Sequence, residues 1–530
     1  MPEVTASGAE PDKPVRGQSL LDDLRRPEAY PEPRPSAVTL VTTHISWVFL
    51  TDREVWKLKR PVDYGFVDYT TVERRRQCCE DEVRLNRRLA PDVYLGVVPV
   101  RLGPEGHWLG PDGEIVDYAV RMRRLPDDRS MEALLRRGAL TPEHLQRLAA
   151  RLARFFTTAT PAPEAGTIEA IRGPVTENFA EVEPFVGRFV SREVFDAVRD
   201  WQVGTLAREA ARFEERIRQG RIRDGHGDLR LEHVYFEGRD PIAIDCVEFS
   251  SRLRNGDAAG DVAFLAMELA ARSRTDLGEC FLAEFARESD DHDLYGLIDF
   301  YASYRAWVRG KVAALLAADP STVPEKAERK ANEARALFGL ARAYAGERPA
   351  DGPVIAVGGV IGSGKTTLAE GLGRTVGVPV ISSDRVRKSL AGVAPTERAP
   401  AEAYSAAFSA RTFDEVFRQA TTVLRSGRVV ILDATFRARA HRLRARDLAR
   451  RHGRRFVFVE AVADEATLRA RLRARAEGPS ISDAGESLLE RVQAEFEPVT
   501  ELDRGEHVRA STAGPPAASV RAVLDFLSSQ

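Results

Sequence analysis

The chain has 530 residues, 43% of them hydrophobic and 30% charged, with a formal net charge of −2 at pH 7. This length exceeds what one hydrophobic core organises, so two or three domains are expected. The balanced charge argues against a basic nucleic-acid binder, and no apolar run approaches the ~20 residues that would span a membrane. Four cysteines are too few for a disulfide scaffold and the N-terminus lacks a signal-peptide layout, so a cytoplasmic protein with reduced thiols is expected.

The N-terminal two thirds of the chain mixes strand and helix patterns. Residues 1–36 are rich in Pro, Glu, Asp and Ser, and a flexible arm with one short helix near 20–26 is expected. Residues 38–62 contain β-favouring runs separated by turns, which predicts an antiparallel hairpin or meander. The elements expected next are a helix at 71–90, strands at 97–102 and 114–123, mostly helix at 130–218, a strand-loop-strand segment at 222–250, and helices from 258 to about 345.

The C-terminal third alternates strand and helix after a break at Asp351-Gly352-Pro353. The expected elements are 354–358, 366–375, 378–381, 413–425, 428–432, 438–451, 455–461 and 465–475. Short connections between alternating strands and helices predict a mainly parallel sheet covered by helices. The resulting organisation is a flexible arm (1–36), an α+β domain (37–346), a linker (347–353) and an α/β domain (354–530).

Residues 359–366 read Gly-Val-Ile-Gly-Ser-Gly-Lys-Thr and match the phosphate-loop pattern G-x-x-x-x-G-K-[ST] between an apolar strand and a helix. Glycines let backbone N–H groups turn inward around a phosphate, and the helix N-terminus adds its positive dipole end. Lys365 would neutralise phosphate charge, and the Thr366 hydroxyl would hold Mg²⁺. The pattern predicts binding of a nucleoside triphosphate by Gly359, Gly362, Ser363, Gly364, Lys365, Thr366 and Thr367.

Three further features accompany this loop. Asp384 and Arg387 follow the strand expected at 378–381, and Asp433 ends the apolar run 429–432, where a carboxylate would orient metal-bound water. An arginine-rich helix then leads into an expected flexible stretch, 477–485. A mobile segment of this kind is expected to act as a lid that closes over the phosphates. Arg471 and Arg475 are the candidate arginines of this lid.

Residues 354–505 resemble small P-loop kinases of the polynucleotide-kinase and gluconate-kinase group, with zeta-toxin-like kinases as cousins. The resemblance implies that Asp384 acts as the base toward an acceptor hydroxyl and that Arg387 clamps the acceptor or a phosphate. A nucleic-acid acceptor stays open but is not favoured, because Tyr404, Phe408 and Phe413 are too few aromatic residues to decide for base stacking. The arginines between 437 and 455 are interpreted as a solvated helix face rather than a polyanion site.

A second motif lies in the N-terminal part. Residues 226–233 read His-Gly-Asp-Leu-Arg-Leu-Glu-His, and Asp245 ends a short apolar run after a turn. In kinase-fold phosphotransferases one carboxylate lies beside the acceptor hydroxyl and a second carries the metal that bridges the phosphates. Upstream, Lys57 or Lys59 on an expected strand and Glu82 on the following helix can form the lysine–glutamate pair that orients phosphate oxygens.

With these residues, positions 38–310 resemble the aminoglycoside phosphotransferase-like family, which has a protein-kinase-like fold. The resemblance implies Asp228 as catalytic base, Asp245 as metal ligand and Lys57 as phosphate-binding lysine, with Lys59 as an alternative. Three stretches are similar to a branch of uncharacterised bacterial proteins in which a P-loop domain follows the phosphotransferase-like one: 63–68, 82–86 and 304–311.

Two positions depart from the family pattern. His233 stands where the family usually places a metal-binding Asn, and a neutral imidazole suits Mn, Zn or Ni better than Mg²⁺. His233 is therefore a candidate metal ligand, with Mn²⁺ as an alternative to Mg²⁺ at this site. Glu248 either supplies the oxygen ligand that His233 does not, or is a solvated turn residue.

Taken as a whole, the sequence is interpreted as a cytoplasmic two-domain phosphotransferase that moves the γ-phosphate of ATP to hydroxyl groups of small molecules. Two alternatives remain: an ATP-dependent regulatory protein with a pseudokinase N-terminal domain, and a polynucleotide 5′-hydroxyl kinase in the C-terminal domain. No membrane partner is expected. The acceptors, the coupling of the two sites and the oligomeric state are left open.

Overall fold

The computed structural model describes residues 16–65, 67–238, 240–348, 351–476, 481–483 and 485–529. Contacts between Cα atoms divide the chain into two compact units. The first contains Met1–Ala139 and His226–Asn255, and the second contains Leu140–Gly225 and Gly256–Gln530. The linker expected at 347–353 lies in the second unit, and the four-part organisation expected from the sequence stays a prediction.

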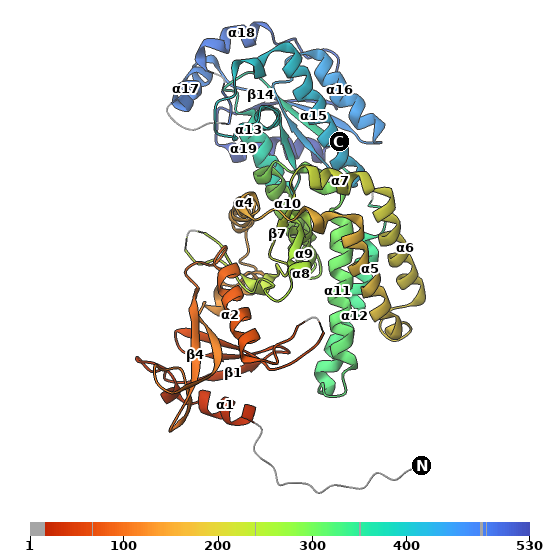
Figure 1. The fold of residues 1–530 in the computed structure, drawn as a ribbon. Helices are drawn as coiled ribbons and strands as arrows, with labels where there is room; N and C mark the ends of the chain where they lie inside the picture. Colours follow the sequence, from red (N-terminus) through yellow and green to blue (C-terminus); the bar gives the residue numbers. More distant parts are fainter. Residues whose placement is uncertain are drawn as a thin grey trace. The chain divides into compact units, whose positions relative to one another are not determined.

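The first unit is built on a six-stranded sheet with strand order β1-β2-β3-β6-β4-β5. Its neighbouring strands are antiparallel, which confirms the meander expected near residue 50. The strands are β1 (Thr39–Thr42), β2 (Ser46–Leu50), β3 (Glu54–Lys59), β4 (Tyr94–Gly103), β5 (Gly106–Trp108) and β6 (Glu114–Arg123). Helix α2 (Val72–Asn86) begins after Thr71, whose side chain accepts from the Arg74 backbone N–H, and packs on β4 and β6 (Figure 1).

The other face of this sheet is covered by the N-terminal segment. Helix α1 (Arg16–Leu24) and the 3-10 turn Pro27–Ala29 place Leu24 and Tyr30 in one buried cluster with Phe49 and Trp56. The Tyr30 hydroxyl donates to the Leu24 carbonyl at 2.7 Å. Residues 1–15 of the expected arm lie outside the described residues, whereas the later part of that arm packs because its apolar side chains find this cluster.

The remaining elements of the first unit carry the second motif. Helix α3 (Met131–Arg136) packs against the 3-10 turn Leu231–His233 and against β8 (Val234–Tyr235). Strand β8 forms a short antiparallel pair with β9 (Ile242–Ala243), and helix α8 (Ser251–Arg254) follows in the chain. Asp228 precedes this pair and Asp245 follows it. The pair therefore brings the two acidic positions of the motif to the same end of a hairpin.

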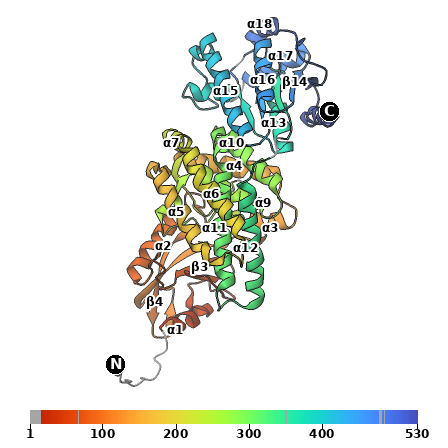
Figure 2. The ribbon, with the colours of Figure 1, turned by 90° about the vertical axis from the view of Figure 1, so that its right-hand side faces the viewer.

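The second unit begins with a helical part whose long helices α11 and α12 lie side by side (Figure 2). Trp307 is fully buried there among the rings of Phe179, Phe195 and Phe338. No helix in the described part of the chain is long and apolar enough to cross a membrane. The helices are α4 (Pro142–Thr158), α5 (Ile168–Val182), α6 (Arg192–Arg208), α7 (Ala210–Arg218), α9 (Ala258–Ala270), α10 (Thr275–Ser289), α11 (Ile298–Ala318) and α12 (Pro324–Tyr344), and the short strands are β7 (Ile222–Asp224) and β10 (Asn255–Asp257).

The same unit continues into a five-stranded sheet with order β12-β13-β11-β14-β15. All neighbouring strands are parallel, which confirms the expected α/β fold. The strands are β11 (Val354–Gly358), β12 (Val380–Ser382), β13 (Ile431–Asp433), β14 (Phe456–Val462) and β15 (His507–Ser511). The helices are α13 (Lys365–Val376), α14 (Ser383–Leu390), α15 (Ala406–Arg425), α16 (Arg439–Arg451), α17 (Glu465–Ala476), α18 (Leu489–Ala494) and α19 (Pro516–Ser528).

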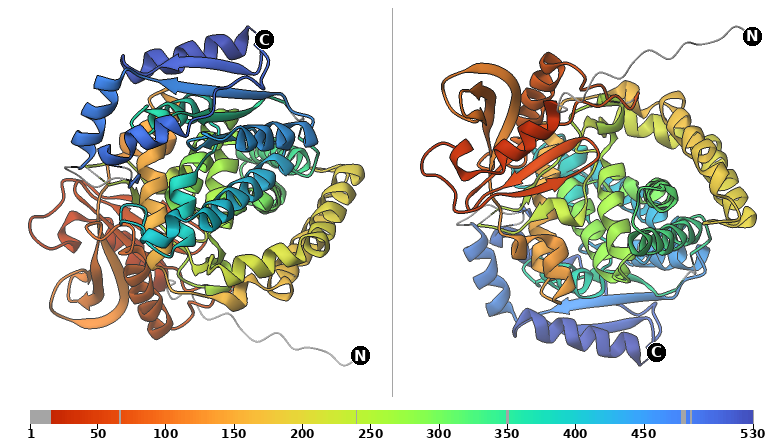
Figure 3. Two further views of the ribbon diagram at one scale, coloured as in Figure 1. Left: turned by 90° about the horizontal axis from the view of Figure 1, so that it is seen from above. Right: turned by 90° about the horizontal axis from the view of Figure 1, so that it is seen from below.

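Side chains of α13 and α19 share one buried cluster with the strands of this sheet. Helix α19 runs beside β15 at the end of the chain (Figure 3). Three elements, α14, β15 and α19, were not expected from the sequence. Strand β15 reads His-Val-Arg-Ala-Ser and shows mixed exposure, so it lacks the apolar run that identified the buried strands.

Candidate functional site

The phosphate loop joins β11 to α13 with the backbone bend that its glycines predict. Gly359 and Gly364 have φ angles of 140° and 78°, and Gly364 is the N-cap of α13. A Cβ atom on Gly359 would lie 2.5 Å from the Ala461 carbonyl oxygen, so only glycine fits there. The loop thus directs the N-terminus of α13 toward the space that a phosphate would occupy.

Two predicted metal ligands meet beside this loop. The Thr366 hydroxyl donates to Asp433 Oδ2 at 2.9 Å, and Asp433 ends the buried strand β13. Asp433 Oδ1 and Ser363 Oγ are buried without a hydrogen-bond partner among the described residues. Buried polar atoms normally have hydrogen-bond or metal partners, so these two atoms mark a place where a bound ligand would provide the missing partners. Hydroxyl and carboxylate oxygens are ligands that suit Mg²⁺.

The pKa of Asp433 depends on charges both in the phosphate loop and at Asp384. Burial raises the pKa of Asp433 to about 6, the charge of Lys365 counteracts the rise, and the nearby carboxylate of Asp384 adds to it. Lys365, Asp384 and Asp433 therefore act on one another electrostatically. A divalent cation beside Asp433 would favour its ionised form.

Asp384 and Arg387 both lie on α14, at the end of the edge strand β12. Asp384 is half-buried, whereas Arg387 is buried. Arg387 donates to the Ala403 carbonyl and, at 3.2 Å, to the Ser409 hydroxyl, and its guanidinium stacks on Tyr404. Its Nε atom has no hydrogen-bond partner in the described part of the chain. Arg387 thus connects α14 to the segment around residues 403–409. Its role in clamping the acceptor or a phosphate stays a prediction.

One of the two predicted lid arginines reaches the phosphate loop. Arg471 on α17 donates to the Gly362 carbonyl at 3.3 Å and to the Thr512 hydroxyl at 3.1 Å. Arg475 lies one turn further along the same helix and is half-buried. Of the expected flexible stretch 477–485, residues 477–480 and 484 lie outside the described residues. The geometry therefore favours Arg471 over Arg475 as the arginine beside the phosphates.

Several arginines between 437 and 455 are held by acidic partners. The ion pairs are Arg437–Glu495, Arg442–Glu501, Arg444–Asp414, Arg446–Glu506 and Arg450–Glu506. Arg442 is fully buried, and Arg454 donates to backbone carbonyls of residues 351, 352 and 427. These contacts favour a structural use of the cluster over a polyanion site.

In the first unit, Lys57 on β3 joins two of the predicted site residues. Its Nζ atom lies 2.9 Å from Glu82 Oε1 and 2.7 Å from Asp245 Oδ1. Burial alone would lower the pKa of Lys57, but the carboxylates of Asp245 and Glu82 raise it well above its ordinary value. The structure therefore forms the lysine–glutamate pair that the sequence predicts and extends it to Asp245.

The alternative lysine, Lys59, is enclosed on the same strand. Its fully buried Nζ atom lies 2.6 Å from Glu82 Oε2 and also donates to Glu248, which in turn accepts from the Tyr69 hydroxyl at 3.3 Å. Lys57 keeps some exposure and Lys59 none, so the geometry favours Lys57 as the phosphate-binding residue. Because Glu248 is bound to Lys59 and buried, it is poorly placed to replace His233 as a metal ligand.

Two residues to which the sequence assigned no role in the site, Tyr94 and Asn86, hold the loop that carries Asp245. Asp245 has a left-handed backbone, with φ 61°, and its N–H donates to the Tyr94 hydroxyl at 3.1 Å. The next N–H, of Cys246, donates to Asn86 Oδ1 at 2.8 Å. Asn86 lies one helical turn after Glu82 on α2, and this spacing was a signal that both face the site.

The two histidines of the motif have tautomers that their partners determine. His226 Nε2 donates to the Ile244 carbonyl at 3.0 Å, so Nδ1 can accept from the Asp228 N–H at 3.3 Å. His233 Nδ1 lies 2.8 Å from the Asp228 carbonyl oxygen, which can only accept, so Nδ1 carries the hydrogen. In the neutral ring the lone pair is then on Nε2, which lies 3.6 Å from Asp245 Oδ2. His233 is therefore oriented as a metal ligand would be.

Comparison with known proteins places the chain in a family. Residues 354–499 match the family described as AAA domain, which confirms the predicted P-loop domain. The uncharacterized protein Rv2004c of Mycobacterium tuberculosis is 33% identical over 501 residues, covering 93% of this chain and 96% of the relative. The uncharacterized protein Mb2027c of Mycobacterium bovis matches to the same extent. The chain belongs to the family of these mycobacterial proteins.

Solved structures resemble the two predicted parts separately. A gluconokinase from Sinorhizobium meliloti 1021 is 22% identical with a TM-score of 0.26, covering 33% of this chain and 92% of that one. A mutant aminoglycoside 2′-phosphotransferase-IIIa with bound GDP is 15% identical with a TM-score of 0.37, covering 59% of this chain and 95% of that one. At these identities and TM-scores, the likenesses say nothing of activity.

Proposed function

We propose that this protein is an ATP-dependent phosphotransferase with two sites, which moves γ-phosphate to hydroxyl groups of small molecules in the cytoplasm. The observation that carries the proposal is the pair of unpartnered buried oxygens, Asp433 Oδ1 and Ser363 Oγ, beside the phosphate loop. A polar site that is incomplete within the folded chain is what a bound nucleotide and cation would complete. The experiment that tests it is phosphate transfer from labelled ATP by single-site variants of the whole chain.

At the P-loop site each residue has a distinct part in this proposal. Backbone N–H groups of the loop and the Lys365 ammonium would bind the β- and γ-phosphates. Thr366 and Asp433 would hold Mg²⁺, which neutralises phosphate charge when bound. Asp384 would accept the proton of the acceptor hydroxyl, and Arg471 would stabilise charge on the transferring group.

Replacing Asp384 by asparagine is expected to lower phosphate transfer roughly 10²-fold while ATP affinity changes little, because basicity is lost and size is kept. The measurement is transfer from labelled ATP into a small-molecule extract, alongside ATP binding, in an Asp228→Asn background that removes transfer by the N-terminal site. Asp414→Asn is the matched control, since Asp414 is exposed on α15 and pairs with Arg444. A loss confined to ATP binding would instead make Asp384 a metal or structural residue.

At the N-terminal site, Lys57 would bind the phosphates and Glu82 would hold Lys57 in place. Asp245 and His233 would hold the metal, Mg²⁺ or Mn²⁺, whose positive charge would offset the negative charge of the phosphates. Asp228 would accept the proton of the acceptor hydroxyl, and its side chain is one-third exposed. The bond from His233 to the Asp228 carbonyl couples the metal side of this site to its acceptor side.

The metal preference of this site is expected to depend on His233. An imidazole nitrogen suits Mn²⁺ better than Mg²⁺, so Mn²⁺ should support nucleotide binding better, and His233→Asn should shift the preference back toward Mg²⁺. The measurement is ATP binding by the full chain across both metals, in a Lys365→Ala background that silences the P-loop site. His107→Asn is the control, since His107 pairs with Asp23 on the other side of the sheet. An unchanged metal preference in His233→Asn would remove His233 from the ligand set.

A polynucleotide acceptor is the weaker alternative for the P-loop site. The cationic residues that would serve a nucleic-acid strand are largely bound to glutamates and aspartates or to backbone carbonyls. A strand would have to compete with these partners for each arginine. Small-molecule acceptors therefore remain the proposal for both sites.

A further inference from the structure

Two side chains of the helical part contact the strand and helix that carry Asp384. We call β12 and α14 together the acceptor wall (residues 380–390). Arg385 of the wall donates from Nε to Asp290 Oδ1 at 2.7 Å, and Arg385 is buried. His292 donates from Nε2 to the Val380 carbonyl at 3.1 Å. The acceptor wall is thus bonded at both of its elements to the segment that follows α10.

That segment is itself held from behind by buried charges. Asp291 accepts from Arg216, and Arg216 donates to both oxygens of Asp257 at 2.8 and 2.6 Å. All three side chains are essentially inaccessible to solvent. Asp293 accepts from Arg418 of α15 at 2.9 and 2.7 Å. Each residue from 290 to 293 is therefore fixed by a polar contact.

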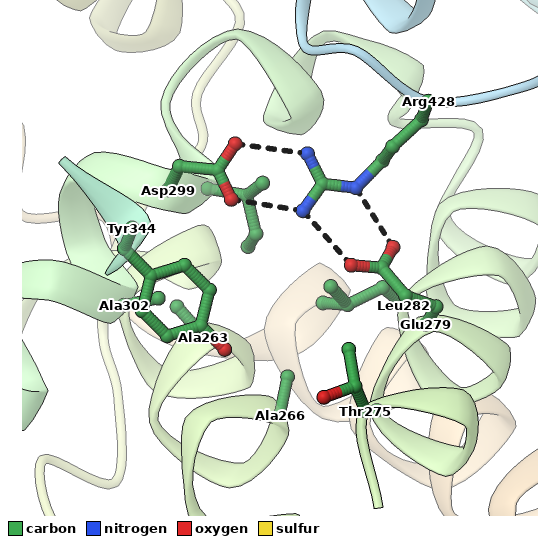
Figure 4. A pocket seen from close by; sticks show the side chains of 11 residues that line it. Ala263, Ala266, Thr275, Glu279, Leu282, Asp299, Ala302, Tyr344 and Arg428 are labelled. Atoms are coloured by element: carbon green, nitrogen blue, oxygen red, sulfur yellow. Dashed lines mark hydrogen bonds and ion pairs between the residues drawn. The ribbon is translucent and has the colours of Figure 1, made fainter. Parts of the chain in front are cut away.

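A second junction holds the segment that leads into β13, the strand of Asp433. Arg428 donates to both oxygens of Asp299 and both oxygens of Glu279, at distances from 2.7 to 3.0 Å (Figure 4). Arg348 contacts the same two carboxylates at 2.9 and 3.0 Å. Two arginines and two carboxylates thus balance their charge where the helical part meets the sheet. The parallel sheet is joined to the helical part on the side of β12 and β13.

The acceptor wall depends on such contacts because it is short. Strand β12 has 3 residues and lies at the edge of the sheet, and α14 has 8 residues. Isolated helices of this length are unstable in water, so the position of α14 is determined by what it packs against. The buried guanidinium of Arg385 needs a negative partner, and Asp290 supplies it.

The backbone conformation of Asp290 indicates that its side chain has a specific role. Asp290 follows α10 as its C-cap in the left-handed region, with φ 50° and ψ 40°. Glycine adopts this conformation without steric cost and is the usual residue there. The carboxylate of Asp290 is what distinguishes it from glycine, and that carboxylate is bound to Arg385.

We propose that Asp290 is a positioning residue for the P-loop site: through Arg385 it holds α14 so that Asp384 faces the acceptor. This inference rests on the proposed function of that site. The helical part that follows the N-terminal motif thereby completes the acceptor side of the C-terminal site. An aspartate of one predicted domain then sets the geometry of the other.

The test uses the full chain with Asp290→Gly, which keeps the left-handed backbone and removes the carboxylate. Amide hydrogen exchange over residues 380–390 is expected to speed up about 10-fold or more, because a buried charge loses its partner. Asp276→Asn is the control, since Asp276 lies on the same helix α10 in an exposed pair with Arg274. Unchanged exchange over 380–390 in Asp290→Gly would overturn the inference.

Phosphate transfer gives the second readout, which separates positioning from mere stability. In an Asp228→Asn background, which removes transfer by the N-terminal site, Asp290→Gly is expected to lower transfer about 10-fold with an unchanged KM for ATP. Combining Asp290→Gly with Asp384→Asn in that background should lower transfer no further than Asp384→Asn alone. Losses that multiply in the double variant would contradict action through Asp384. Failure of the proposed function would appear differently, as wild-type transfer by Lys365→Ala, and the exchange measurement would still decide the role of Asp290.

Discussion

Replacing Lys365 by alanine is expected to lower phosphate transfer at the P-loop site by about 10²–10³-fold, the loss typical for one preorganised charge-stabilising group. The ammonium is buried at the start of α13, where the phosphates would lie. Its charge also opposes the burial that raises the pKa of Asp433 to about 6. Without Lys365 that pKa would rise further, so less of Asp433 would be ionised near neutral pH to hold a cation.

The measurement is transfer from γ-labelled ATP by the full chain in an Asp228→Asn background, which removes the contribution of the N-terminal site. Lys330→Ala is the matched control, because Lys330 lies on α12 and pairs with Glu333 on the same helix. Thermal unfolding of both variants should match that of the background protein. Retention of transfer in the Lys365 variant would exclude the P-loop as a catalytic site.

The second large effect is expected at the N-terminal site, where substitutions of two aspartates should impair different steps, nucleotide binding in one case and phosphate transfer in the other. Asp245→Ala should weaken metal-dependent nucleotide binding by about 10²-fold, because the triphosphate loses the cation that offsets its charge. Asp228→Asn should leave binding intact and lower transfer by roughly 10²–10⁴-fold, the usual contribution of a general base. Binding and transfer are measured separately in a Lys365→Ala background.

Asp92→Asn serves as the control for these variants, since Asp92 is exposed just before β4. Measuring nucleotide binding and phosphate transfer separately distinguishes an active phosphotransferase site from a pseudokinase site. Intact, metal-independent nucleotide binding by Asp245→Ala, together with no transfer by the unmodified site, would favour the regulatory protein with a pseudokinase N-terminal domain.

Local patterns were sufficient to predict the fold class and the positions of most elements. The parallel sheet is confirmed although its paired strands are distant in the chain, because the local alternation of strand and helix patterns indicates such a sheet. The phosphate loop and the antiparallel strands near residue 50 are confirmed, and each depends on residues that are close in sequence. The lysine–glutamate pair was predictable for the same reason, since Lys57 and Glu82 lie on a strand and the helix that follows it.

The rest depends on pairs that are distant in sequence. Nothing near Lys59 indicates that it binds Glu248, and nothing near Arg385 indicates that it binds Asp290. Packing decides such pairs, because a buried charge takes whichever opposite charge the fold brings to it. For the same reason the sequence left Lys57 and Lys59 as alternatives, whereas burial separates them.

The presence of two phosphotransfer sites in one chain can be decided by measuring transfer from γ-labelled ATP into a small-molecule extract. The proteins compared are the unmodified chain, Lys365→Ala, Asp228→Asn and the double variant. If both sites transfer phosphate, each single variant loses a different set of labelled products and the double variant forms none. Labelled products that persist unchanged in the double variant would contradict the presence of these two sites.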